Sequence, residues 1–199
     1  PGAEIGLHPR STWNNPEPEV VLAVDSRGRI KGATLGNDVN LRDFEGRSAL
    51  LLGKAKDNNG ACAIGPALRL LDSDFDLDAI RGIEVELEVT GTDGFHLAGR
   101  SSMAEISRDI TELVTHTIGP THQYPDGVML FCGTMFAPVA DRDEPGRGFT
   151  HKLGDMVRIA APPLGGLVNR VGYSDKIAPW TFGVTALMRS LAKRGLLAA

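Results

Sequence analysis

The chain has 199 residues, 42% of them hydrophobic and 23% charged, and its formal net charge at pH 7 is −4. This length supports one sizeable core, so we expect a single domain over residues 1–199, and the ordinary globular composition argues against disorder. The negative net charge and the absence of a basic block disfavour binding to nucleic acid or to a membrane surface, and no apolar run is long enough to span a membrane.

The turn-forming residues indicate the fold class, and the cysteines indicate the cellular compartment. The 24 glycines and 12 prolines indicate many turns and hence a β-rich fold. The two cysteines, Cys62 and Cys132, lie in apolar or small-residue surroundings without metal-ligand spacing. We expect buried free thiols and a cytoplasmic protein.

The first predicted element is a β-hairpin. Apolar residues crowd positions 20–24, residues 26–29 form a turn, and residues 30–35 resume the apolar character. Glu17 and Glu19 share one face at the entry to the first strand, because residues two apart in a strand point the same way. The return strand can bring Asp38 close to them.

Three converging carboxylates repel one another and need a cation, and oxygen-only ligands suit Mg²⁺, Mn²⁺ or Ca²⁺ rather than zinc. The alternative is a solvated strand edge, since Pro16 and Pro18 flank the first glutamate and discourage pairing with other chains. A second acidic triplet shows how common such patterns are, because it alternates with apolar residues as in a strand with one wet face: Glu84, Glu86 and Glu88.

The remaining pattern predicts mostly strands, with helices in the middle and at the end. A capping box at residues 102–105 predicts a helix that runs to about His116. The apolar face of a C-terminal helix over residues 180–194 is predicted to contain Val184, Leu187, Met188 and Leu191. The predicted strands are 83–89, 95–98, 128–132 (of the buried kind), 156–160 and 167–171.

Taken together, these motifs resemble the fumarylacetoacetate hydrolase family in order and spacing over nearly the whole chain. The similarity is closest to its sugar-acid dehydratase branch, which acts on 2-keto-3-deoxypentonates. The matching pieces are Pro16-Glu17-Pro18-Glu19, Gly36-Asn37-Asp38-Val39-Asn40-Leu41-Arg42-Asp43, Lys56 ahead of Cys62-Ala63-Ile64-Gly65-Pro66, and Pro125-Asp126-Gly127 before Gly133-Thr134.

The resemblance implies a mixed, β-rich α+β fold: a fumarylacetoacetate hydrolase-like β-roll or barrel with few helices, usually a homodimer or a higher homo-oligomer. It implies that Glu17, Glu19 and Asp38 bind Mg²⁺, with Mn²⁺ or Ca²⁺ as alternatives. Lys56 is implied as the active-site lysine and Thr134 as a contact for the substrate carboxylate. Each of the last two also has a plain interpretation, because most lysines are exposed and a threonine can simply end a strand.

Two departures from the family pattern bear on the reaction. Glu45 stands where the C–C hydrolases of the family commonly have glutamine, and a carboxyl group can exchange protons where an amide cannot. Relatives carry a lid and often a catalytic acidic or histidine residue upstream of the glutamate pair, whereas only sixteen residues precede Glu17 here. The sequence is thus expected to lack an N-terminal lid or domain, or to have its lid supplied differently; His8 is more readily interpreted as a surface residue than as a substitute.

The leading hypothesis is a Mg²⁺-dependent dehydratase that converts a 2-keto-3-deoxypentonate to 2,5-dioxopentanoate and water through a metal-stabilised enolate. Glu45 would act as general acid at the C4 hydroxyl, and Lys56 would take the C3 proton or stabilise the enolate oxygen. One alternative is a C–C hydrolase of a 2,4-diketo acid of the fumarylpyruvate or acylpyruvate type. The other is a metal-binding fragment that is inactive without its lid.

Overall fold

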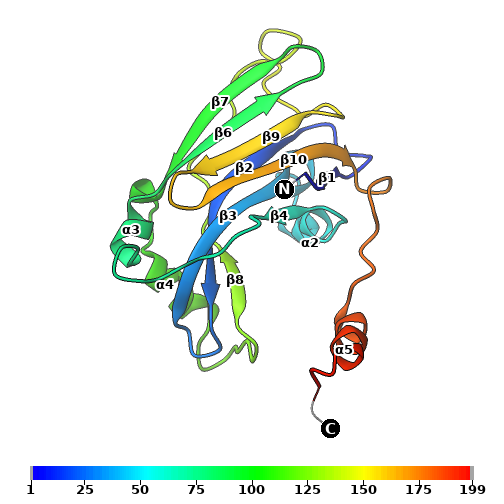
Figure 1. Cartoon of the computed structure of the whole chain (residues 1–199). Coiled ribbons are helices and arrows are strands. Elements are labelled where there is room, and N and C mark those ends of the chain that lie inside the picture. The colour runs from blue at the N-terminus through cyan, green and yellow to red at the C-terminus, as the bar shows by residue number, and fades with distance from the viewer. Residues whose placement is uncertain (1, 198–199) are drawn as a thin grey trace.

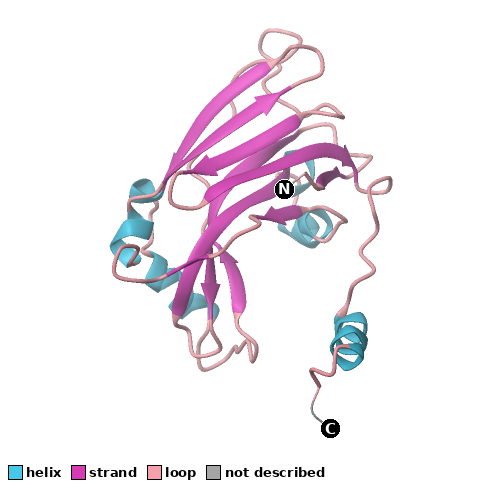
Figure 2. Cartoon of the chain, viewed as in Figure 1, coloured by secondary structure: helices cyan, strands magenta, loops and turns pink. Residues whose placement is uncertain are grey.

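Two β-sheets make up most of the protein, as a computed structural model that describes residues 2–197 shows (Figures 1 and 2). The first sheet, sheet A, contains in spatial order β1 (Glu4–Leu7), β10 (Gly165–Tyr173), β9 (Met156–Ala161), β6 (Glu84–Thr90) and β7 (His96–Ser102). The second, sheet B, contains β4 (Cys62–Ile64), β3 (Ile30–Leu41), β2 (Asn14–Val24) and β8 (Val128–Phe131), and β5 (Arg69–Leu70) also pairs with β3. The predicted β-rich fold with few helices is confirmed.

The helices are short and connect or flank the sheets. They are α1 (Arg42–Glu45), α2 (Leu52–Lys56), α3 (Leu77–Arg81), α4 (Ile110–Thr117) and α5 (Val184–Lys193), with single 3₁₀ turns at Ala49–Leu51 and Met103–Glu105. Within the described part of the chain, none of the helices is long and apolar enough to cross a membrane.

The predicted hairpin is confirmed as β2 and β3, the longest strands of the described chain. They pair in antiparallel register, with Glu17 directly opposite Asp38 and Glu19 opposite Gly36. Alternation along β2 assigns its two faces: Val20, Leu22 and Val24 belong to the buried core. The odd-numbered positions, which include both glutamates, therefore lie on the other face of the strand.

The core between the sheets is apolar on both sides. Sheet B contributes Val20, Leu22 and Leu35, and sheet A contributes Leu87 and Ile159, all 2% exposed or less. On β6 the burial alternates, with Glu84 and Glu86 exposed, which confirms the prediction that this acidic strand has a wet face. The second acidic triplet is therefore solvent-facing, unlike the first.

Three predicted elements differ from the structure. The middle helix starts at Ile110, not at Ser102, because Asp109 accepts a hydrogen bond from the Thr111 N–H and caps it, and the capping-box residues form a 3₁₀ turn. Strand β8 was predicted as buried but is half-exposed, since it pairs with β2 at the edge of sheet B.

The C-terminal helix starts at Val184 rather than at residue 180, and it contains no buried residue. It stands clear of both sheets, joined to β10 by an extended segment (Figure 1). The predicted apolar face therefore exists but does not pack on the core.

Candidate functional site

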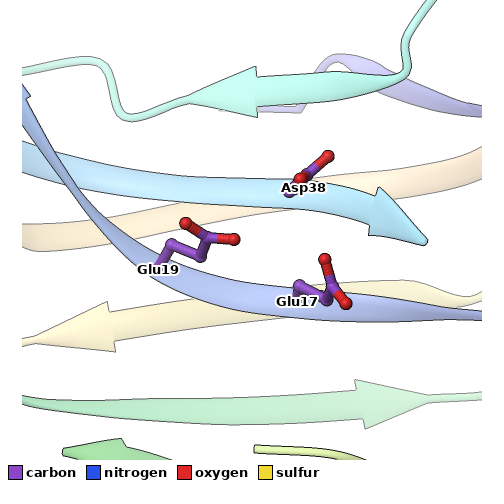
Figure 3. Close-up of side chains that lie close together, drawn as sticks. All are labelled: Glu17, Glu19 and Asp38. Atoms are coloured by element: carbon purple, nitrogen blue, oxygen red, sulfur yellow. The ribbon is translucent and has the colours of Figure 1, made fainter. Parts of the chain in front are cut away.

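The three acidic residues of the hairpin form one cluster. Glu17 and Glu19 come from β2 and Asp38 from the neighbouring β3 (Figure 3). One carboxylate oxygen from each lies within 4.8 Å of the others. This geometry follows from the strand register, because Glu17 faces Asp38 across the ladder and Glu19 shares its face.

Lys56 and Glu45 join this cluster from the two helices that follow β3. Lys56, the last residue of α2, places its Nζ 2.8 Å from Asp38 Oδ2, 3.2 Å from Glu45 Oε1 and 3.7 Å from Glu17 Oε2. Glu45 is the last residue of α1. We call these five residues the acidic centre: Glu17, Glu19, Asp38, Glu45 and Lys56.

The protonation of Lys56 is set by its neighbours. Burial lowers its pKa, but the hydrogen bond to Asp38 and the charges of Asp38, Glu17 and Glu45 outweigh burial, and the net result is a raised pKa. Lys56 is thus a stable ammonium group in this arrangement. It can donate hydrogen bonds and stabilise negative charge, whereas a nucleophilic or basic amine is disfavoured.

For the two glutamates, burial outweighs the neighbouring positive charge and favours the neutral form. Burial raises the pKa of Glu19 to about 7, despite the Gly133 N–H, which donates a hydrogen bond of 2.6 Å to its Oε2. Burial also raises the pKa of Glu17, partly offset by Lys56 and by the Asn40 amide. Four carboxyl groups around one ammonium leave an excess of negative charge, which a divalent cation would neutralise.

The donor set fits a hard divalent cation. All three candidate ligands are carboxylates, they converge from adjacent strands, and their mutual spacing allows one ion to contact them together. The absence of sulfur and imidazole from the cluster argues for Mg²⁺, Mn²⁺ or Ca²⁺ rather than zinc. The sequence-based expectation of a cluster of these three residues agrees with the geometry.

Two supporting groups were missed by sequence reasoning. Asn40 donates a hydrogen bond of 2.6 Å from Nδ2 to Glu17 Oε1, and period-2 alternation from Asp38 could have placed it on this face. Gly133 adopts φ = 89°, a left-handed conformation that favours glycine, and its N–H reaches Glu19. No local signal relates residues 19 and 133, which are 114 positions apart.

Thr134 lies on the same loop, next to Gly133. Its Oγ1 accepts a hydrogen bond of 3.2 Å from the Phe136 N–H and lies 3.5 Å from Ser101 Oγ. The hydroxyl is thus engaged with its own loop, which is the plain interpretation that the sequence left open. Its neighbour's contact with Glu19 nevertheless keeps Thr134 close to the acidic centre.

Three further residues that the sequence analysis named are His8 and the two cysteines. The His8 ring packs edge-on against Phe44, with 5.0 Å between ring centroids, and its Nδ1 accepts the Arg10 N–H. Both cysteines are free, but the prediction that both are buried is wrong: Cys62 is exposed on β4, opposite Asp38, and Cys132 is half-buried. The short edge strand β4 leaves the Cys62 side chain uncovered.

Comparison with known proteins identifies relatives. The chain is 30% identical over 176 residues to a 2-dehydro-3-deoxy-D-arabinonate dehydratase of Saccharolobus solfataricus, a match that covers 88% of this chain and 55% of the relative. It is 32% identical over 174 residues to a probable 2-keto-3-deoxyxylonate dehydratase of Haloferax volcanii, covering 86% of this chain and 55% of that protein. The chain thus spans little more than half the length of these relatives.

Solved structures of similar fold include a dehydratase and a hydrolase. A 2-keto-3-deoxy-D-arabinonate dehydratase complexed with magnesium and 2,5-dioxopentanoate matches with a TM-score of 0.73 at 29% identity, over 86% of this chain and 57% of that one. A fumarylpyruvate hydrolase from Pseudomonas aeruginosa shares the fold, with a TM-score of 0.62 at 19% identity, over 86% of this chain and 71% of that one. The model of the fumarylacetoacetate (FAA) hydrolase C-terminal family matches residues 16–172. The chain therefore belongs to the fumarylacetoacetate hydrolase C-terminal family.

Proposed function

We propose that residues 1–199 form the catalytic unit of a Mg²⁺-dependent dehydratase that converts 2-keto-3-deoxypentonates to 2,5-dioxopentanoate and water. The observation that carries this proposal is the acidic centre itself, in which three convergent carboxylates stand beside the Lys56 ammonium and the Glu45 carboxyl. The names of the relatives support the substrate class, since one is a 2-dehydro-3-deoxy-D-arabinonate dehydratase, another is a probable 2-keto-3-deoxyxylonate dehydratase, and a solved relative is complexed with magnesium and 2,5-dioxopentanoate.

Glu17, Glu19 and Asp38 are the proposed ligands of the cation, with Mn²⁺ or Ca²⁺ as alternatives to Mg²⁺. When bound, such an ion would supply Lewis acidity that polarises the 2-oxo group and offsets the charge that develops as the C3 proton leaves. The Asn40 amide and the Gly133 N–H would keep the Glu17 and Glu19 carboxylates oriented toward the ion.

Lys56 is proposed to act as a charged hydrogen-bond donor. Because its neighbours hold it as an ammonium, it suits stabilisation of an enolate oxygen better than removal of the C3 proton. The role of Thr134 is proposed as a contact for the substrate carboxylate, which requires its hydroxyl to turn from the Phe136 N–H.

Glu45 is proposed as the proton-transfer group. Among residues 2–197, its Oε1 is buried and has an ion pair with Lys56 but no hydrogen-bond partner, so it is a polar atom that a bound substrate hydroxyl would satisfy. As a carboxylate it would take the C3 proton, and as the acid it would return that proton to the C4 hydroxyl, which leaves as water. The unsaturated acid then loses a proton at C5 and gains one at C3, which gives an enol between C4 and C5. This enol becomes the aldehyde of 2,5-dioxopentanoate when its C5 hydroxyl loses its proton and C4 takes one up.

The test is an assay of the purified chain with Mg²⁺ on 2-keto-3-deoxypentonates and, separately, on a 2,4-diketo acid. We expect the aldehyde product from the first substrate and no pyruvate from the second. Pyruvate alone would instead assign the chain to the C–C hydrolases, and metal binding without either product would identify a metal-binding fragment that needs a lid.

Glu45→Gln separates the proton-transfer role from metal binding. We expect dehydration to fall by about 10²- to 10⁴-fold, since the amide cannot exchange the proton, while Mg²⁺ affinity measured by calorimetry stays nearly unchanged. Glu86→Gln, on the solvent face of β6, is the matched control and should retain activity. Full activity of Glu45→Gln would remove Glu45 from the mechanism.

Homodimer formation and a cytoplasmic location complete the proposal. Two free thiols fit a reducing compartment, because an oxidising one favours disulfides.

A further inference from the structure

The C-terminal arm, residues 179–197, exposes an unusual amount of apolar surface. Trp180 is 80% exposed, Phe182 59% and Val184 75%, and α5 itself contains no buried residue. Helix α5 of the arm stands clear of the sheets in Figure 1, and the whole arm lies beyond residue 172, where the family match ends. So many exposed apolar side chains on one short segment are typical of an interaction site rather than of a free surface.

The helix also needs a partner for its own stability. α5 spans ten residues, and helices shorter than about 12 residues are marginal in water without tertiary packing. Its exposed Leu187 and Met188 repeat with Val184 and Leu191 at helical spacing, so that they form one apolar face. Docking this face on another surface would supply the missing packing.

The charge of the arm indicates which partner surface it would bind. The arm contains Arg189, Lys193 and Arg194 and no acidic residue, and because the whole chain carries −4, the rest of it carries −7. The arm is therefore complementary in charge to the body of its own chain, which favours a second copy over a basic or neutral partner.

An acceptor with the matching chemistry lies at the edge of sheet B. Ile64 on β4, Leu70 on β5 and Leu68 between these strands are each at least 40% exposed. An acidic segment follows directly, with exposed side chains at Asp72, Asp74, Asp76 and Asp78. Apolar groups beside negative charge are what a basic amphipathic helix requires, and an uncovered sheet edge is normally protected by another element.

We propose that the C-terminal arm of each copy docks on the β4–β5 edge and the adjacent acidic segment of a second copy. The exchange is reciprocal, so it closes a two-fold symmetric dimer with two identical contacts. The inference specifies the surface of the proposed homodimer and is independent of the proposed reaction, because its readout is the dissociation constant of the dimer.

Sedimentation equilibrium of the 199-residue chain over a range of concentrations tests the proposal. We expect a dimer whose dissociation constant rises at least about tenfold in the double variant Leu187→Asp/Met188→Asp and in Leu70→Asp. Val139→Asp, at an 88% exposed apolar position outside both surfaces, should leave it unchanged. Thermal unfolding of each variant confirms that the body still folds.

A charge exchange tests the pairing more sharply. Lys193→Glu and Asp74→Lys should each weaken the dimer, and the two together should restore it in part, because the exchanged charges attract again. The competing partner for the basic, apolar arm is an anionic membrane surface, and co-sedimentation with phosphatidylserine-containing vesicles tests it. A monomer at every concentration, a dimer that the arm variants leave intact, or a monomer that binds the vesicles would each overturn the proposal.

Discussion

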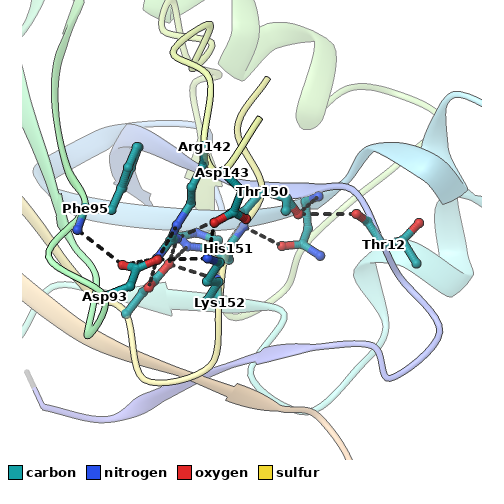
Figure 4. A network of polar contacts seen from close by, with 10 residues as sticks. Thr12, Asp93, Phe95, Arg142, Asp143, Thr150, His151 and Lys152 are labelled. Carbon is teal, nitrogen blue, oxygen red and sulfur yellow. Dashed lines mark hydrogen bonds and ion pairs between the residues drawn. The ribbon is translucent and has the colours of Figure 1, made fainter. Parts of the chain in front are cut away.

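Two clusters of charged side chains in this molecule are built in opposite ways. In the acidic centre, four carboxyl groups surround the single ammonium of Lys56. In the second group, which we call the charged network, positive and negative side chains alternate on the loop between β6 and β7 and on the loop before β9 (Figure 4). Its members are Asp93, Arg142, Asp143, His151, Lys152 and Asp155.

This difference in counter-charge changes the pKa values of the buried carboxyl groups. Burial raises the pKa of Asp155, but hydrogen bonds from His151 and Arg142 outweigh it and hold the value at about 2. Burial of Glu19 has no comparable compensation, and its pKa rises to about 7. The charged network thus stabilises its carboxylates, whereas the acidic centre holds carboxylates that lack their counter-charge. Such an imbalance is typical of a functional site.

The largest effect is expected from breaking the charged network. Arg142 donates hydrogen bonds of 2.6 and 2.9 Å to the fully buried Asp155, so Arg142→Met would leave that carboxylate largely uncompensated. We expect a loss of about 3–5 kcal/mol in the free energy of unfolding, measured by urea denaturation. Arg147→Met, which removes an exposed pair with Glu144, should cost at most about 1 kcal/mol. Equal effects would mean that the network is not a stabilising device.

Removing a carboxylate from the acidic centre should have the opposite effect on stability. Glu19→Gln removes a buried negative charge, so the metal-free protein should unfold at a higher temperature, while affinity for Mg²⁺ should fall by about 100-fold or more. Calorimetric titration and thermal unfolding measure the two quantities. Glu86→Gln on β6 is the control, and a Glu19→Gln protein with unchanged Mg²⁺ affinity would contradict the proposed ligand set.

Asn40 tests how much a neutral hydrogen-bond donor contributes to the acidic centre, because its amide binds the Glu17 carboxylate. Asn40→Ala removes the hydrogen bond to Glu17 Oε1, and we expect Mg²⁺ affinity to fall by about tenfold. Asn40→Gln should recover part of that affinity if its amide reaches the same oxygen. A loss of thermal stability with no change in affinity would show that the amide serves packing alone.

The smallest expected effect is a dependence of stability on pH that originates in the charged network. Burial lowers the pKa of His151 below its usual value of 6.5, so the unfolded chain takes up a proton before the folded one does. Stability should therefore fall as pH decreases below about 6.5, with a slope of at most about 1.4 kcal/mol per pH unit from this group. The lowered pKa of Asp155 adds a further loss below about pH 4.

Urea denaturation at a series of pH values measures this slope. His151→Gln should flatten the curve between about pH 6.5 and 5, whereas His116→Gln, at an exposed position, should leave it unchanged. An unaltered curve in His151→Gln would assign the pH dependence to other groups.

Short-range periodicity was sufficient to predict the cluster of three carboxylates. The apolar runs 20–24 and 30–35 and the turn at residues 26–29 predict a hairpin, and the observed register places Glu17 opposite Asp38. The motifs with Asp38, Lys56 and Thr134 likewise predicted the family and the β-rich fold, because their order and spacing are properties of the chain itself.

Tertiary structure decided the features that join distant segments. The Gly133 N–H that holds Glu19, the ammonium state of Lys56 and the pairing of Arg142 with Asp93 depend on loops that meet only after folding. The predicted start of the middle helix was wrong, because the helix begins at Ile110. The sequence predicted the apolar face of α5 but not that this face is uncovered, since an apolar stripe predicts a helix and not the surface that covers it. The sequence by itself determined which carboxylates converge, because neighbouring strands are related locally. The packing of remote segments determined how each charge is compensated, because burial and counter-charge are properties of the folded whole.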